Sequence, residues 1–171
     1  MKAAWGHMER PVTLLFIDTE FTSLKAPELI SVALVDEHGR EFYAERSDFP
    51  VEACTPFVVA EVLPLLRPER GRKPFGAIQR ELAEWLEPYS SGQAVICCDD
   101  HRDWTPFCEL MGDAVPPWVR VAWIASQLDE GVLVEYFARP GVRRHHALDD
   151  AHGNRLALAA VRASSGATIK S

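Results

Sequence analysis

Cysteine is scarce in this chain, and its spacing excludes the common zinc and redox motifs. No Cys-x-x-Cys pair occurs. Two cysteines are adjacent within an apolar run of strand type, which favours buried free thiols over disulfides or zinc ligands. We therefore expect a reducing, cytoplasmic environment. The four cysteines are Cys54, Cys97, Cys98 and Cys108.

Long apolar runs, repeats and low-complexity segments are also lacking. No run approaches the roughly 20 residues that cross a bilayer, and Met1 to Pro11 has no apolar core of the signal-peptide kind. We expect no membrane contact. The 171 residues, 47% hydrophobic and 25% charged, suit one globular domain. We expect a flexible N-terminus at 1–11, a single domain at 12–163 and a C-terminal tail at 164–171.

An excess of positive charge is lacking too. The net charge of −7 speaks against a protein that coats nucleic acid through overall attraction. Basic residues nevertheless gather in two segments that we expect to be loops. Their charges have two explanations, ordinary solvated loop charge or two local contacts for phosphate. The two groups are Arg67, Arg70, Arg72 and Lys73, and then Arg139, Arg143 and Arg144.

What the sequence does contain is an apolar run that ends in two acidic residues. Leu14 to Ile17 leads directly into Asp18 and Glu20. Residues two apart on a strand point to the same face, so both carboxylates lie together at the end of a buried element. Burying two like charges is costly without a cation, and hard oxygen ligands suit Mg²⁺ or Mn²⁺. Taken alone, such a pair is more often a solvated strand end.

The hydrophobic periodicity predicts strands first, and then helices that alternate with strands. Strands are expected at 12–17, 28–35, 40–45, 94–98 and 119–124, with a short turn at 36–39 that joins the second and third as a hairpin. Helices are expected at 55–66, 74–87, 103–111 and 146–163. A three-strand meander followed by this alternation predicts an α/β fold, a mixed sheet with helices on its faces.

Two further acidic segments follow the first. Asp99, Asp100 and Asp103 come after the expected strand 94–98, and the segment 145–151 reads His-His-Ala-Leu-Asp-Asp-Ala. Each has an ordinary explanation, because a lone histidine often caps a helix and aspartates in a first turn meet the helix dipole favourably. The order of all three segments along the chain is much harder to obtain by chance.

In these three segments the chain resembles the DEDDh branch of the 3′–5′ exonucleases. That superfamily contains the DnaQ-type proofreading subunits, RNase T and oligoribonuclease. The matching pieces are Phe16 to Thr22, Ala94 to Asp103, and His145 to Ala151. The stretch from Glu28 to Glu45 is similar to a compact group of bacterial exoribonuclease-like proteins. The resemblance extends from Thr13 to Ala160 and implies an RNase H-like mixed sheet.

The resemblance also implies a chemistry and its residues. It implies a 3′–5′ exonuclease, with an exoribonuclease favoured, that hydrolyses single-stranded RNA or DNA from the 3′ end. Asp18, Glu20, Asp103 and Asp150 would hold two divalent ions, Mg²⁺ or Mn²⁺. The family's His-x₄-Asp spacing selects His145 with Asp150, and an imidazole suits removal of a proton from the attacking water. We expect His145 in the loop before the last helix.

Several assignments stay open within that interpretation. Asp103 is preferred as the second-segment acid because Asp-Trp-x-x-Phe can open a helix with the acid at its start, and Asp99 is its main rival. Phe21 and Thr22 are expected to contact the terminal nucleotide, although core packing explains Phe21 equally well. RNA rather than DNA is only a preference, and a homodimer is expected by analogy with small relatives.

Two other functions match parts of the pattern. The segment Asp18 to Thr22 nearly matches the Asp-x-Asp-x-Thr of haloacid-dehalogenase-type phosphatases, in which the first Asp is a nucleophile. Glu20 has the wrong length for that pattern, and Asp149 and Asp150 lie in helix-like rather than strand-end sequence. The second alternative is a nuclease-like fold that only binds nucleic acid or a protein. All five expected catalytic residue types are present, which argues against it.

Overall fold

The computed structural model describes residues 10–67, 71–112 and 115–165. Most of the segment expected as a flexible N-terminus and most of the expected C-terminal tail therefore lie outside the described residues. The final helix continues to Ser165, two residues beyond the expected end of the domain. Among the helices in the described ranges, none combines the length and apolar character needed to span a bilayer.

The centre of the protein is a mixed five-stranded sheet in the order β3-β2-β1-β4-β5. The first three strands form an antiparallel meander, while β4 and β5 join it in parallel. The expected α/β sheet and its hairpin turn are confirmed. The strands are β1 (Val12–Phe21), β2 (Leu29–Asp36), β3 (Glu41–Glu45), β4 (Gln93–Cys98) and β5 (Val119–Trp123).

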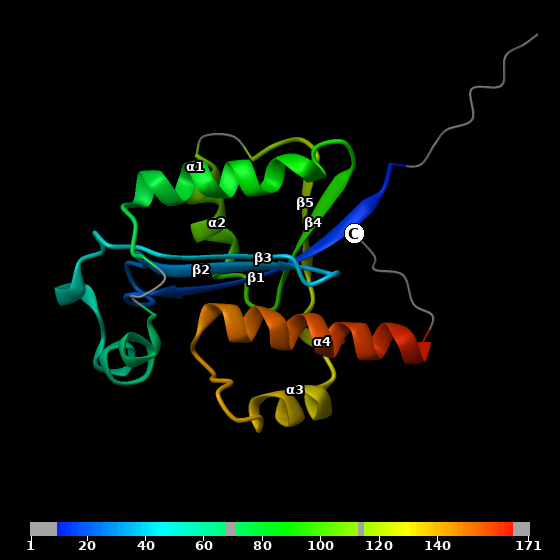
Figure 1. Ribbon diagram of the computed structural model, residues 1–171. Helices are drawn as coiled ribbons and strands as arrows, with labels where there is room; N and C mark the ends of the chain where they lie inside the picture. Colours follow the sequence, from blue (N-terminus) through cyan, green and yellow to red (C-terminus); the bar gives the residue numbers. More distant parts are fainter. Residues whose placement is uncertain (1–9, 68–70, 113–114, 166–171) are drawn as a thin grey trace, which may run out of the picture.

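Helices cover both faces of the sheet (Figure 1). Helices α1 (Phe75–Leu86) and α2 (Trp104–Met111) lie on one face, and α4 (Ala147–Ser165) lies on the other with α3 (Glu130–Phe137) packed against it. Because both faces are covered, all eight residues of β2 are buried. Parallel strands with helical connections and an antiparallel meander together make a three-layered α/β protein.

The alternation of side chains along β1 decides which layer each residue joins. Leu15 and Ile17 pack with α1 and α2, whereas Leu14 and Phe16 pack toward Leu158 of α4. Because side chains alternate along a strand, the next residues in the Leu14 and Phe16 series, Asp18 and Glu20, also point to the α4 face.

Two expectations about secondary structure were wrong in detail, and one helix was missed. Strand β1 continues through both acids to Phe21, because its antiparallel pairing with β2 extends that far. The expected helix at 55–66 contains a π-helix, η2 (Val58–Val62), followed by a 3₁₀ turn, η3 (Leu63–Leu65). Helix α3 was missed, because only Tyr136 of its residues is buried and no regular apolar stripe marks it.

Candidate active site

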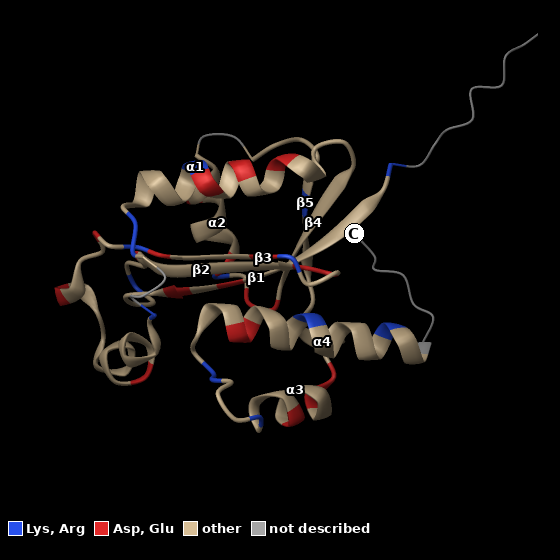
Figure 2. Cartoon of the chain, viewed as in Figure 1, with Lys and Arg blue, Asp and Glu red and all other residues tan. Residues whose placement is uncertain are grey.

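Asp18 and Glu20 leave β1 where one of its two neighbouring strands has stopped pairing. The parallel register with β4 runs only to Phe16 opposite Cys97, whereas the pairing with β2 continues. Beyond β4, the chain turns through Asp99 to the start of α2. The acids of β1 therefore lie beside a loop on the β4 side, while β2 still pairs with them on the other side. Figure 2 shows acidic positions in the first turn of α4, which lies against one face of the sheet.

Five carboxylates gather there in two groups of three that share Asp18. One group is Asp18, Asp99 and Asp103, and the other is Asp18, Glu20 and Asp150. Within each group, one oxygen of every residue lies within 4.8 Å of the others. The structure thus brings together all four acids that the sequence singled out, and it adds Asp99, which had been considered only as a rival of Asp103.

Hydrogen bonds hold two of these acids in place. Asp103 immediately precedes α2 and is 4% exposed. Its Oδ1 accepts hydrogen bonds from the backbone N–H of Thr19 at 3.0 Å and from the Thr19 hydroxyl at 2.7 Å. Asp150 lies in the first turn of α4, where its Oδ2 accepts the backbone N–H of His146 at 3.1 Å. The starts of α2 and α4 are thereby aligned on β1.

The electrostatics of the group are unfavourable without a positive charge. Burial is the main cause that raises the pKa of Glu20 to about 8 and those of Asp103 and Asp150 to about 7. Burial also raises the pKa of Asp18, and the neighbouring charges of Asp103 and Asp150 raise it further. For Asp103 the hydrogen bonds from Thr19 act in the opposite direction. A cation between the carboxylates would remove this repulsion.

The donor set fits hard divalent cations. Every ligand atom available in the two groups is a carboxylate oxygen, the donor that Mg²⁺ and Mn²⁺ prefer, and no cysteine or histidine belongs to either group. Asp99 belongs to the first group, and its Oδ1 is buried and has no hydrogen-bond partner among the described residues. A buried acceptor in that state is rare in proteins, and an ion can satisfy it.

The acids form one wall of a cavity of about 840 Å³. His145 lines the same cavity and is exposed, two residues before α4 begins, as expected. Its backbone has a φ of 64°, the left-handed region that non-glycine residues seldom adopt. His146 is placed differently. It is 3% exposed, and its ring stacks on that of Tyr43 with centroids 5.1 Å apart. Of the two histidines, only His145 faces the cavity.

Phe21 and Thr22 occupy different surroundings. Phe21 lines the cavity and is half-buried. Thr22 is fully buried, and its hydroxyl oxygen accepts the backbone N–H of Glu28 at 3.2 Å, closing the turn after β1. Since Thr22 does not line the cavity, its position does not support the expected contact with a nucleotide.

Most of the first basic segment is engaged in ion pairs. Arg67 lies 3.8 Å from Asp149, Arg72 lies 3.2 Å from Glu45, and Lys73 pairs with Glu81. Arg70 lies outside the described residues. From the second segment, only Arg144 lines the cavity. The phosphate contacts inferred from the sequence are thus not supported for the first segment.

Comparisons with known proteins bear on the fold. No protein-family model matches the sequence, and no curated protein matches it. Its fold is similar to that of E. coli exonuclease I. One structure of that enzyme is in complex with a dA16 oligonucleotide and another with a 5cy-dA13 oligonucleotide, with TM-scores of 0.56 and 0.54. Each shares 13% sequence identity, and each match covers 90% of this chain. The chain spans 41% of the length of exonuclease I. The mixed sheet and its helices therefore have a fold like that found in exonuclease I.

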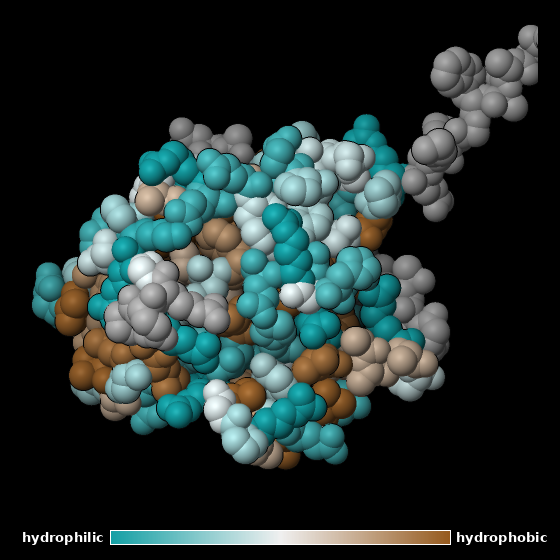
Figure 3. Space-filling model, in the orientation of Figure 1, coloured by the Kyte–Doolittle hydropathy of each residue, from teal (hydrophilic) through white to brown (hydrophobic). Residues whose placement is uncertain are grey.

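Sequence reasoning missed several residues of the cavity wall. Lys25 and Arg102 add positive charge to it, and Leu24 and Phe57 add apolar surface. Leu24 is 68% exposed and Phe57 54% exposed. Figure 3 shows apolar surface over the segment around η2. The aromatic residue at the start of the expected helix was a usable signal for Phe57, whereas nothing local marked the other three.

Proposed function

We propose that the protein is a metal-dependent 3′–5′ exonuclease that acts on single-stranded nucleic acid, with RNA favoured. The observation that carries the proposal is that five carboxylates form two clusters of three, with Asp18 in both. These clusters lie in a cavity that His145 also lines. This set of groups suits hydrolysis of a phosphodiester, where charge develops on both the attacking and the leaving oxygen. The fold of E. coli exonuclease I is compatible with it.

In this mechanism Asp18 serves both cation positions. Asp18, Glu20 and Asp150 would hold one ion, and Asp18 and Asp103 would contribute to the other. When bound, two divalent ions lower the pKa of the attacking water and stabilise the charge on the leaving oxygen. Thr19 keeps Asp103 oriented through its two hydrogen bonds. The Phe21 side chain, on the cavity wall, is available to contact the terminal nucleotide.

His145 is the general base in this proposal. His145 is not a member of either cluster of acids, but it lines the same cavity. Its ring can therefore accept a proton from the attacking water while the acids hold the ions. Its exposure leaves the ring able to pass that proton on to solvent. His146 cannot substitute for it, because that ring is buried against Tyr43.

The surroundings support a nucleic-acid end as the substrate. Five carboxylates repel phosphates in the absence of cations, so substrate binding should depend on the metal. Lys25 and Arg144 on the cavity wall offer positive charge to phosphates further along a strand. The two exonuclease I structures contain deoxyadenosine oligonucleotides. The preference for RNA rests on the resemblance to exoribonuclease-like proteins in the segment Glu28 to Glu45.

The proposal includes three features of the whole protein. Residues 12–163 form the exonuclease domain, which associates as a homodimer and works in a reducing cytoplasm. In support of the last point, all four cysteines are free, and burial raises the pKa of Cys97 to about 12, which keeps that thiol protonated and unreactive.

The phosphatase alternative is weaker in this structure. Asp149 and Asp150 lie in the first turn of α4 and not at the end of a strand. A covalent aspartyl-phosphate on Asp18, with no nuclease activity, would nevertheless establish it.

The test is cleavage of end-labelled single-stranded RNA and DNA. With Mg²⁺ or Mn²⁺ we expect a ladder that grows from the 3′ end, and with excess EDTA no cleavage. Asp18→Ala and Glu20→Ala should remove most activity. Undiminished cleavage in chelator would rule out the metal mechanism, and metal-independent binding without any turnover would favour the non-catalytic alternative.

A further inference from the structure

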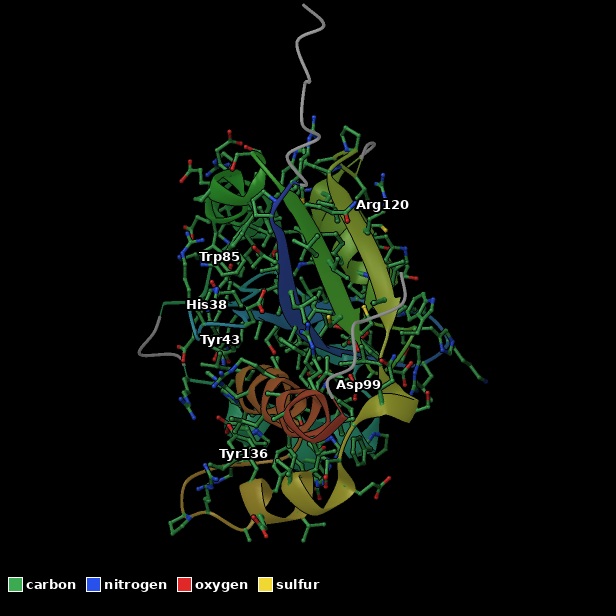
Figure 4. The ribbon with its side chains drawn as sticks, turned by 90° about the vertical axis from the view of Figure 1, so that its right-hand side faces the viewer. His38, Tyr43, Trp85, Asp99, Arg120 and Tyr136 are labelled. Carbon is green, nitrogen blue, oxygen red and sulfur yellow. The ribbon has the colours of Figure 1, made fainter. Side chains whose placement is uncertain are left out.

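Asp99 and Asp103 do not compete for one position in the folded protein. The sequence offered them as alternatives, yet both lie in the carboxylate group of Asp18. Asp103 reaches the site from the residue before α2, and Asp99 reaches it from directly after β4. Figure 4 shows Asp99 beyond the end of β4, near α4. Both side chains can therefore act at once.

The two acids differ in how their oxygens are used. Oδ1 of Asp103 accepts both hydrogen bonds from Thr19. Oδ1 of Asp99 is buried and, among the residues that the structure describes, has no hydrogen-bond partner. An acceptor buried without a partner costs free energy, more so when it carries charge. The Asp99 carboxylate is within reach of a shared ion, since one of its oxygens lies within 4.8 Å of an oxygen of Asp18 and of Asp103.

We propose that Asp99 is a fifth metal-ligating carboxylate, which completes a second cation site with Asp18 and Asp103. This inference rests on the proposed function, because it concerns the second of the two ions in that mechanism. The second ion would then be held by three protein carboxylates, as the first is by Asp18, Glu20 and Asp150. An additional anionic ligand strengthens binding of a hard cation, so the second ion should remain bound even without substrate phosphate.

Asp100 provides a matched control for Asp99. It is the adjacent residue and has the same charge, but it is engaged elsewhere. Its carboxylate forms an ion pair with Arg102, whose Nε donates to Oδ1 at 2.8 Å, and it belongs to neither carboxylate group. Neutralising Asp100 therefore changes the local charge by the same amount without removing a ligand.

The experiment is a titration of the metal-free protein with Mn²⁺. Binding is measured by calorimetry and by the electron paramagnetic resonance signal of free Mn²⁺. We expect two bound ions in the wild type. Asp99→Asn should weaken one of them by about 10- to 100-fold and leave the other unchanged. Asp100→Asn should bind both ions as the wild type does. Glu20→Gln should weaken the other ion instead, which shows that the two sites are separable.

A measurement on the unaltered protein covers the case in which Asp99→Asn does not fold. In an NMR spectrum of the ¹³C-labelled side-chain carboxyl groups, addition of Mg²⁺ should shift the signal of Asp99 together with that of Asp103. An Asp99 signal that does not move, or an Asp99→Asn protein that binds both ions normally, would overturn the inference. A wild type that binds no divalent ion would instead overturn the proposed function.

Discussion

The ring of Phe57 meets the ring of His145 edge-on, with centroids 5.0 Å apart and planes at 86°. Phe57 comes directly before the π-helix η2, and His145 has the strained φ of 64°. Both features are more frequent at functional sites than elsewhere. The contact joins two segments far apart in the sequence, and it restricts where the His145 ring can lie. We infer that Phe57 positions the proposed base.

Replacing Phe57 should therefore slow catalysis. An aromatic pair contributes about 0.5–1.5 kcal/mol, so Phe57→Ala should lower kcat by roughly 2- to 10-fold, with a smaller change in KM. The control is Val59→Ala, since Val59 lies in the π-helix that follows Phe57, is half-exposed and does not line the cavity. Steady-state kinetics on 3′-labelled RNA would measure both. Equal effects of the two variants would mean that Phe57 acts only through the helix.

The two adjacent histidines should respond to substitution in different ways. His145→Ala should lower kcat by roughly 10²- to 10⁴-fold, the range for loss of a positioned general base, and the loss should shrink as pH rises and hydroxide replaces the base. His146→Ala should instead lower the melting temperature, because it removes a buried ring from its stack on Tyr43. Near-normal activity of His145→Ala beside an inactive, well-folded His146→Ala would reverse the assignment.

The sequence predicted the parts of the site that depend on local pattern. The period of two along β1 placed Asp18 and Glu20 on one face, and the spacing before α4 placed His145 in a loop. It could not decide between Asp99 and Asp103, because that question depends on how the turn after β4 crosses β1. The ring contact of Phe57 with His145 is likewise a product of tertiary packing, and no local signal encodes it.

The misses in the fold have similar causes. Helix α3 begins at a good N-cap, since Asp129 accepts the backbone N–H of Val132 at 3.1 Å, but its apolar residues are consecutive rather than helically spaced. The continuation of β1 past its acids depends on β2, a neighbour that only the folded sheet supplies. Pairing and burial across the sheet thus overrode the local boundary that the acids suggested.

Two glycines should behave in opposite ways when changed to alanine. A Cβ on Gly92 would overlap with the backbone oxygen of Pro11, which cannot move aside easily, so Gly92→Ala should destabilise the protein by about 1–3 kcal/mol. A Cβ on Gly76, in the first turn of α1, would meet nothing, so Gly76→Ala should stabilise by about 0.4–1 kcal/mol. Urea denaturation of both variants would measure the difference. A neutral Gly92→Ala would contradict this close approach of Pro11.

The stability of the metal-free protein should fall as pH rises. Burial raises the pKa of Glu20 to about 8 and those of Asp103 and Asp150 to about 7, whereas in the unfolded chain such groups titrate near pH ~4. Between these values the folded protein binds more protons than the unfolded chain, so the free energy of unfolding decreases as pH rises. The contribution of these protonated carboxyl groups to the free energy of unfolding is fully present below their pKa in the unfolded chain. It is lost as pH rises through their pKa in the folded protein.

Urea denaturation in EDTA, at about pH 5.5 and about pH 8.5, tests this directly, and we expect a loss on the order of 2 kcal/mol from each of these groups at the higher pH. Glu20→Gln should reduce that loss, because it removes the group with the most raised of the three stated pKa values. Saturating Mg²⁺ should abolish the loss or reverse it, since the ions bind the ionised carboxylates of the folded state alone. A metal-free protein that is more stable at the higher pH would show that these carboxylates are already ionised and compensated by groups of the protein itself.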